Sequence, residues 1–134
     1  MKLFNFIFYK LPAIAYIALT FYLSSMSRPP VPPNVSDVIL HLIEFALMYV
    51  VVYRAFNNGL FAGLNKKYLI LSMVLLMAYG ILDEVHQSFV PQRVFSIKDM
   101  VMDLAGIIVG TAIALVISRR YRKNGVSRLS KNSV

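Results

Sequence analysis

The 134-residue sequence contains no cysteine, which excludes structural disulfides and thiol chemistry. Charged residues are also scarce. They make up 15% of the chain, against roughly one quarter in a typical soluble domain. Hydrophobic residues make up 58%. This balance indicates a membrane protein.

Four long apolar stretches are each close to the roughly 20 residues that a membrane-spanning helix needs. They are 4–26, 38–55, 68–89 and 100–118. Because their connections are short, we predict one all-α integral membrane four-helix bundle over residues 1–118, followed by a basic tail over 119–134. The first stretch has some features of a signal peptide, but its apolar run is long and lacks a clear cleavage motif.

Lysine and arginine are distributed unequally. Of 14 such residues, only Arg28, Arg93 and Lys98 fall in the first and third connections. By the positive-inside rule, both termini and the second connection are cytoplasmic. The net charge of +8 is then explained by the membrane topology and by attraction of the basic tail to anionic membrane lipids. No nucleic-acid partner is predicted, because no nucleic-acid-binding fold accompanies the basic tail.

All acidic residues and histidines lie near helix ends that this topology places outside. They are Asp37, His41, Glu44, Asp83, Glu84, His86, Asp99 and Asp103. At a rise of about 1.5 Å per residue, His41, Asp83 and Asp103 lie roughly 20 to 22 Å from the cytoplasmic ends of their helices. That is one level within a hydrocarbon core about 30 Å thick. Glu44 is deeper, near the midplane.

Helical spacing indicates which of these groups share a face. Three stripes result: Asp37, His41 and Glu44; Tyr79, Asp83, His86 and Gln87; and Asp99, Asp103, Gly106 and Gly110. Glu84 points about 100° away from the second stripe. The third stripe ends in Gly-x-x-x-Gly, which lets another helix approach closely, so its carboxylates should face protein.

Ionisable groups inside a bilayer cost at least ~2.5 kcal/mol each, so they normally face inward and mark function. We therefore predict a polar ligand pocket that opens outward and is walled by the second, third and fourth helices. Its predicted lining is His41, Glu44, Asp83, Glu84, His86, Gln87, Arg93, Asp99 and Asp103.

Structural alternatives remain open for several of these residues. Ser96 and Asp99 match a helix capping box, and Asp37 follows an N-cap at Ser36. His41 and Glu44 lie too far inside a helix to be caps, but a buried histidine bonded to a carboxylate can be purely structural. His86 can simply be solvated at the membrane interface.

The role of Arg93 and the possibility of a bound metal ion also remain open. Arg93 either neutralises a neighbouring carboxylate or grips a phosphate or carboxylate of a ligand. The acids and histidines offer ligands for zinc or a harder cation, but their spacing fits no established metal motif. No metal or cofactor is predicted.

The stretches "DVILHLIEFALMY" (37–49) and "YGILDEVHQSFVPQRVFSIKDMVMDLAGIIVG" (79–110) resemble the VanZ-like family of small bacterial membrane proteins. The positions that match its pattern are Asp37, His41, Asp83, Glu84, Gln87, Arg93, Asp99 and Gly106. Val38 replaces the family's usual lysine and Asp103 its usual asparagine, so the pocket should be more acidic or share a proton. The resemblance covers roughly 10–118 and implies a role in glycopeptide resistance, to teicoplanin in particular.

Our main hypothesis is a bacterial plasma-membrane protein that binds an envelope lipid, a lipid-linked precursor or a glycopeptide antibiotic from outside. Arg93 would meet the anionic group. The alternatives are a membrane-embedded hydrolase or transferase acting on a lipid-linked phosphate, with Glu44, Asp83 or Glu84 as general base, or a proton-coupled carrier working as a homodimer.

Overall fold

The computed structural model describes the backbone of residues 2–30, 35–60 and 62–131, with side chains as far as Tyr121. Within those ranges every regular element is helical. In chain order they are α1 (Lys2–Asn5), the π-helical η1 (Phe6–Lys10), α2 (Leu11–Ser24), α3 (Asp37–Phe56), α4 (Lys66–Gln87) and α5 (Ile97–Lys131).

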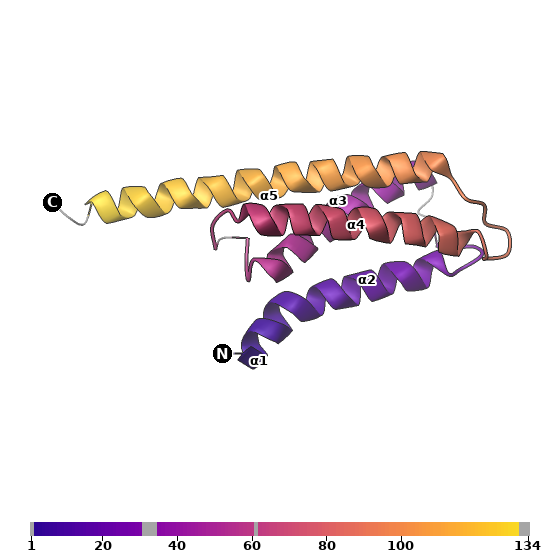
Figure 1. Ribbon diagram of the computed structural model, residues 1–134, viewed down its shortest axis with the longest axis horizontal. Coiled ribbons are helices and arrows are strands. Elements are labelled where there is room, and N and C mark those ends of the chain that lie inside the picture. Colours follow the sequence, from indigo (N-terminus) through magenta and orange to yellow (C-terminus); the bar gives the residue numbers. More distant parts are fainter. Residues whose placement is uncertain (1, 31–34, 61, 132–134) are drawn as a thin grey trace.

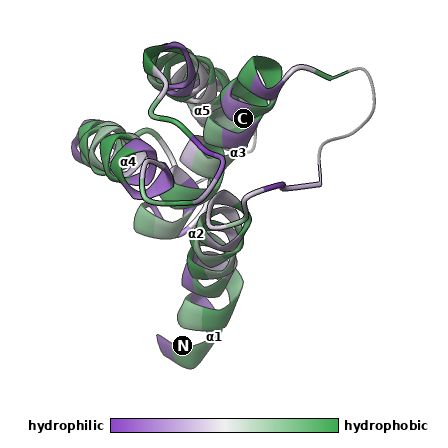
Figure 2. Cartoon of the chain, turned by 90° about the vertical axis from the view of Figure 1, so that its right-hand side faces the viewer, coloured by the Kyte–Doolittle hydropathy of each residue, from purple (hydrophilic) through white to green (hydrophobic). Residues whose placement is uncertain are grey.

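Four helices of the described chain are long and apolar enough to cross a membrane. They are Lys2–Ser24, which joins α1, η1 and α2, then Asp37–Phe56, Lys66–Gln87 and Ile97–Tyr121. Large apolar side chains are exposed along all four, and Figure 2 shows hydrophobic residues spread over the outer faces. A lipid environment accounts for this exposure, because such a surface would drive association in water. The predicted all-α fold with four helices long and apolar enough to span a membrane is confirmed.

Helix boundaries differ from the prediction chiefly at the C-terminal end. The predicted fourth span stops at Ser118, whereas α5 continues to Lys131. Its added residues include no proline and only one glycine, so the backbone can stay helical after the apolar run ends. Residues 119–131 are therefore a polar extension of the last helix.

The closest helix pair is α3 and α5, and two glycines make this packing possible. A Cβ atom at Gly106 would lie 2.5 Å from the carbonyl oxygen of Leu42, and one at Gly110 would lie 2.6 Å from that of Ala46. Both distances are too short for any side chain. The predicted Gly-x-x-x-Gly contact is thus present, and it brings α5 directly against the backbone of α3.

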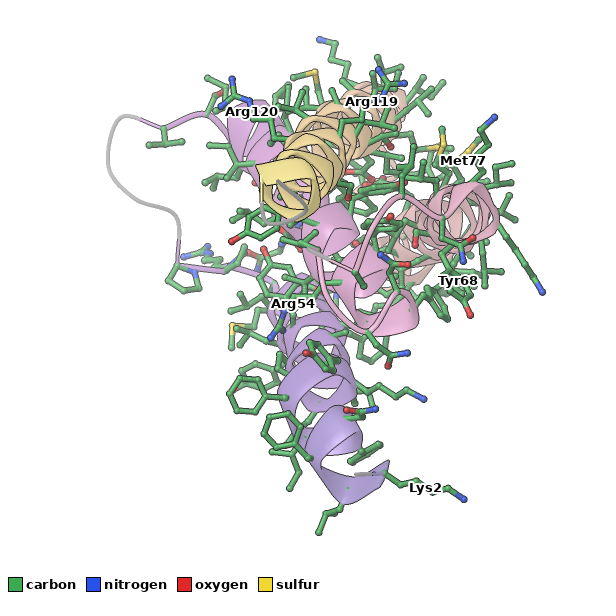
Figure 3. The ribbon with its side chains drawn as sticks, turned by 90° about the vertical axis from the view of Figure 1, so that its left-hand side faces the viewer. Lys2, Arg54, Tyr68, Met77, Arg119 and Arg120 are labelled. Atoms are coloured by element: carbon green, nitrogen blue, oxygen red, sulfur yellow. The ribbon has the colours of Figure 1, made fainter. Side chains whose placement is uncertain are left out.

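The two ends of the bundle differ in charge. The start of α1 and the end of α5 lie at one end, which we call the basic end (Figure 1). Figure 3 looks at this end and shows Lys2, Arg54, Arg119 and Arg120 there. The opposite end, which we call the acidic end, contains the ends of α2 and α4 and the starts of α3 and α5. The acids and histidines fall in these segments.

Candidate functional site

A small polar cavity of about 90 Å³ opens among α2, α3 and α4 at the acidic end. Its polar lining comprises Thr20 and Ser24 of α2, Asp37, His41 and Glu44 of α3, Asp83 and Gln87 of α4, and Arg93. Three carboxylates and one guanidinium therefore surround a space large enough for a few water molecules or part of a lipid head group.

The walls of this cavity differ from those predicted. The first spanning helix supplies one wall, and none of the described lining residues comes from α5. Glu84, His86, Asp99 and Asp103, which the sequence placed in the pocket, are absent from the described lining. For Asp99 and Asp103 the reason is geometric, because α5 packs closely on α3 at Gly106 and supplies none of the described lining.

Asp83, Gln87 and Arg93 form a hydrogen-bonded chain along the cavity. The Gln87 amide Nε2 donates to Asp83 Oδ2 at 2.8 Å, and its Oε1 accepts from Arg93 Nη1 at 2.7 Å. Arg93 Nε also donates to the Met26 carbonyl at 3.3 Å. Arg93 makes no ion pair with an acid of the described chain, so direct neutralisation of Asp83 or Glu84 is wrong. Gln87 separates the two charges while orienting both.

Behind the cavity, His41 meets Asp103 of α5. His41 Nδ1 lies 2.9 Å from Asp103 Oδ1, and both side chains are buried. This is the one ion-pair contact that the structure records over its described residues. Asp103 therefore fixes the orientation of an imidazole that also lines the cavity.

Glu84 is fully buried and lies outside the cavity lining. Its Oε2 accepts the Ser96 backbone N–H at 2.8 Å, while Ser96 Oγ accepts the Asp99 N–H at 3.2 Å. The predicted capping contact from Ser96 is present, but Glu84 takes the reciprocal role predicted for Asp99. The 100° between Asp83 and Glu84 thus places the two acids against different helices, and neither faces lipid.

His86 lies apart from both groups. Its Nε2 is 3.0 Å from Ser25 Oγ, and its ring stacks on Phe21 with a centroid separation of 4.7 Å. It therefore joins α4 to the end of α2 at the surface, outside the cavity.

Four buried oxygen atoms lack a hydrogen-bond partner among the residues that the structure describes. They are Ser24 Oγ, Asp83 Oδ1, Glu84 Oε1 and Asp103 Oδ2. An unsatisfied buried polar group costs about 1 to 3 kcal/mol, more when it is charged. Ser24 and Asp83 line the cavity, so hydrogen-bond donors of a ligand bound there would satisfy both oxygen atoms.

Sequence reasoning missed the wall supplied by α2. Thr20 Oγ1 lies 2.9 Å from Tyr79 OH, which joins α2 to α4, and Ser24 is buried one turn further on. The available signal was two small hydroxyl residues four positions apart at the end of an otherwise apolar run. No charge marked that helix as part of the site.

Four apolar helices long enough to span a membrane, with a polar cavity at one end, define a multi-pass membrane protein. The model of the VanZ/LLP1 family matches residues 3–118, which is most of the chain. The protein belongs to this family of VanZ-like envelope proteins. Searches of curated proteins and of solved structures return no match.

Proposed function

We propose that this protein resides in the bacterial plasma membrane and binds an amphiphilic envelope molecule, an envelope lipid or lipid-linked precursor, in the cavity at its acidic end. The observation that carries the proposal is Asp83 Oδ1, a buried carboxylate oxygen without a donor in the described part of the chain, on a residue that lines the cavity. A ligand with hydroxyl or ammonium donors satisfies it.

The charges around the cavity indicate which kinds of lipid head group it can bind. Asp37, Glu44 and Asp83 attract a donor-rich or cationic group, whereas Arg93 has guanidinium donors left for a phosphate. A head group that carries both an ammonium or sugar hydroxyls and a phosphate fits this pattern. The cavity is too small for a whole glycopeptide, so a teicoplanin-related phenotype would act through the lipid or through one inserted group of the antibiotic.

Binding of a defined lipid tests the cavity. In native mass spectrometry of the purified chain, we expect phosphatidylethanolamine, which carries an ammonium and a phosphate, to be retained over phosphatidylglycerol. Asp83→Asn replaces the free acceptor with a donor of the same shape and should weaken this retention about tenfold, as expected for one charge-assisted hydrogen bond. Asp99→Asn is the matched control outside the cavity.

Cells expressing the same variants provide an independent test. Arg93→Ala and Asp83→Asn should return teicoplanin sensitivity and envelope-lipid composition to the values of cells without the protein. Unchanged lipid retention and unchanged phenotype, at normal expression, would contradict the proposal.

The orientation belongs to the same proposal: the basic end lies in the cytoplasm and the cavity opens outward. Because the chain has no cysteine, single substitutions report on each side. A membrane-impermeant maleimide should label Val94→Cys in intact cells and Ala62→Cys only after permeabilisation, since both positions are exposed. The reverse labelling pattern would place the cavity on the cytoplasmic side.

One observation favours a second function, a hydrolase or transferase acting on a lipid-linked phosphate. His41 lines the cavity and is held by Asp103, which is how a general base is oriented, and Arg93 could stabilise developing phosphate charge. Turnover of a lipid-linked phosphate by the purified chain, lost in His41→Gln, would establish this activity over simple binding.

A further inference from the structure

Three buried side chains with metal-ligand chemistry meet between α3, α4 and α5, behind the cavity. One ligand atom from each of His41, Glu84 and Asp103 lies within 4.8 Å of the others. The residues are 7%, 0% and 3% exposed. Three different helices thus bring one imidazole and two carboxylates to a single buried point.

In each carboxylate of this cluster, one oxygen takes part in a hydrogen bond and the other has no partner among the described residues. Ser96 N–H donates to Glu84 Oε2, and His41 Nδ1 bonds Asp103 Oδ1. Glu84 Oε1 and Asp103 Oδ2 are buried and find no donor anywhere in the described ranges. Two carboxylates this close repel each other when ionised, so the arrangement calls for a positive charge between them.

We propose that His41, Glu84 and Asp103 bind one divalent transition-metal ion such as Zn²⁺ or Mn²⁺. The imidazole selects a first-row transition ion over Ca²⁺ or Mg²⁺, which prefer oxygen ligands alone. A charge of +2 balances the two carboxylates and leaves a neutral site, which suits a buried position in a membrane protein.

The spacing of the ligand atoms is compatible with a common ion. Ligands about 2.0 to 2.2 Å from one ion lie roughly 3 to 4.4 Å apart. The 2.9 Å between His41 Nδ1 and Asp103 Oδ1 lies just below this range and the limit of 4.8 Å just above it, so ion binding needs only small shifts of the three side chains. The ion would take the place of the proton that now joins these two atoms, and that proton would be released.

This site is separable from the lipid cavity and does not depend on its ligand. His41 belongs to the cavity lining and gives an ion a path inward. The acids of the two sites are different, because Asp83 lines the cavity and Glu84 belongs to the metal cluster. They are adjacent acids of α4, one in the cavity and one in the cluster. The proposal departs from the sequence-based expectation that no metal is bound, which rested on spacing along the chain alone.

Metal titration of the full chain in lipid nanodiscs, with affinity tags removed and bound metal stripped by chelator, tests the site. We expect saturable binding of one Zn²⁺ per chain, undiminished by excess Mg²⁺, and visible d–d absorption bands much more intense than those of aqueous Co²⁺ when Co²⁺ is bound. Glu84→Gln should lower the Zn²⁺ affinity by more than the ~10 to 100-fold typical of losing an outer-shell partner. Asp83→Asn, the comparison variant on the neighbouring acid, should lower the Zn²⁺ affinity much less than Glu84→Gln does while weakening lipid retention about tenfold.

Several outcomes would overturn the proposal. Absence of saturable binding in the wild type would assign the two free oxygens to a shared proton. Equal affinity in Glu84→Gln, or Co²⁺ with only the weak d–d bands of the aqueous ion, would show only adventitious binding. The wild-type stoichiometry and spectrum decide the question even if the Glu84 variant fails to fold. Lipid retention lost in Asp83→Asn with no metal bound by the wild type would leave the proposed function standing and refute the metal site alone.

Discussion

Valine at Gly106 is expected to eliminate most of the folded protein. The added Cβ atom would lie 2.5 Å from the Leu42 carbonyl oxygen and 2.9 Å from Phe45 Cβ, well short of the 3.4 Å at which ordinary contact begins. Neither neighbour can yield, because one is backbone and the other is the first atom of a buried side chain. Helices α3 and α5 would have to separate, at a cost of about 3 kcal/mol or more.

Folded yield measures this effect directly. We expect Gly106→Val to lose its monodisperse peak in size-exclusion chromatography in mild detergent. Ala112→Val adds volume six residues along the same helix at an exposed position and should elute like the wild type. A well-folded Gly106→Val protein of normal thermal stability would show that the close approach of α3 and α5 is not needed.

The spans and the close helix pair could be predicted from the sequence because each rests on a local signal. Apolar runs near 20 residues mark spans wherever a bilayer is the solvent. Gly106 and Gly110 mark a close approach because only glycine leaves room for another backbone. The length of α5 beyond Ser118 could not be predicted from hydropathy, since a helix ends where hydrogen bonding ends and not where its apolar residues do.

The sequence predicted that polar groups gather at one level of the bundle, but it did not predict which of them line the cavity or that α2 supplies a wall. Helical spacing correctly placed Asp83 and Glu84 on different faces of α4. It could not tell which face meets which neighbour, because that depends on the order of helices around the bundle. The acids therefore appeared as one pocket, whereas packing separates a cavity at Asp83 from a cluster at Asp103.

The second large effect concerns the buried pair of His41 and Asp103. Asp103→Leu keeps a similar volume but leaves the His41 imidazole buried without its partner, and His41→Leu leaves the carboxylate in the same position. Removing one member of a buried pair costs about 3 to 5 kcal/mol. In chelator-treated protein, so that no ion contributes, each single variant should show a strongly lowered temperature of unfolding.

The double variant is the decisive measurement, because a paired interaction predicts that the two losses do not add. With both polar groups gone, nothing at these positions requires a partner, so the double Leu variant should be more stable than either single one. Ser25 and His86 offer a matched control, a second histidine bond between helices, at 3.0 Å but exposed. The Ser25→Ala and His86→Leu cycle should show coupling below about 1 kcal/mol. Additive losses at His41 and Asp103 would mean that the two side chains do not interact in the folded protein, and that Asp103 neither orients the imidazole nor shares a metal ion with it.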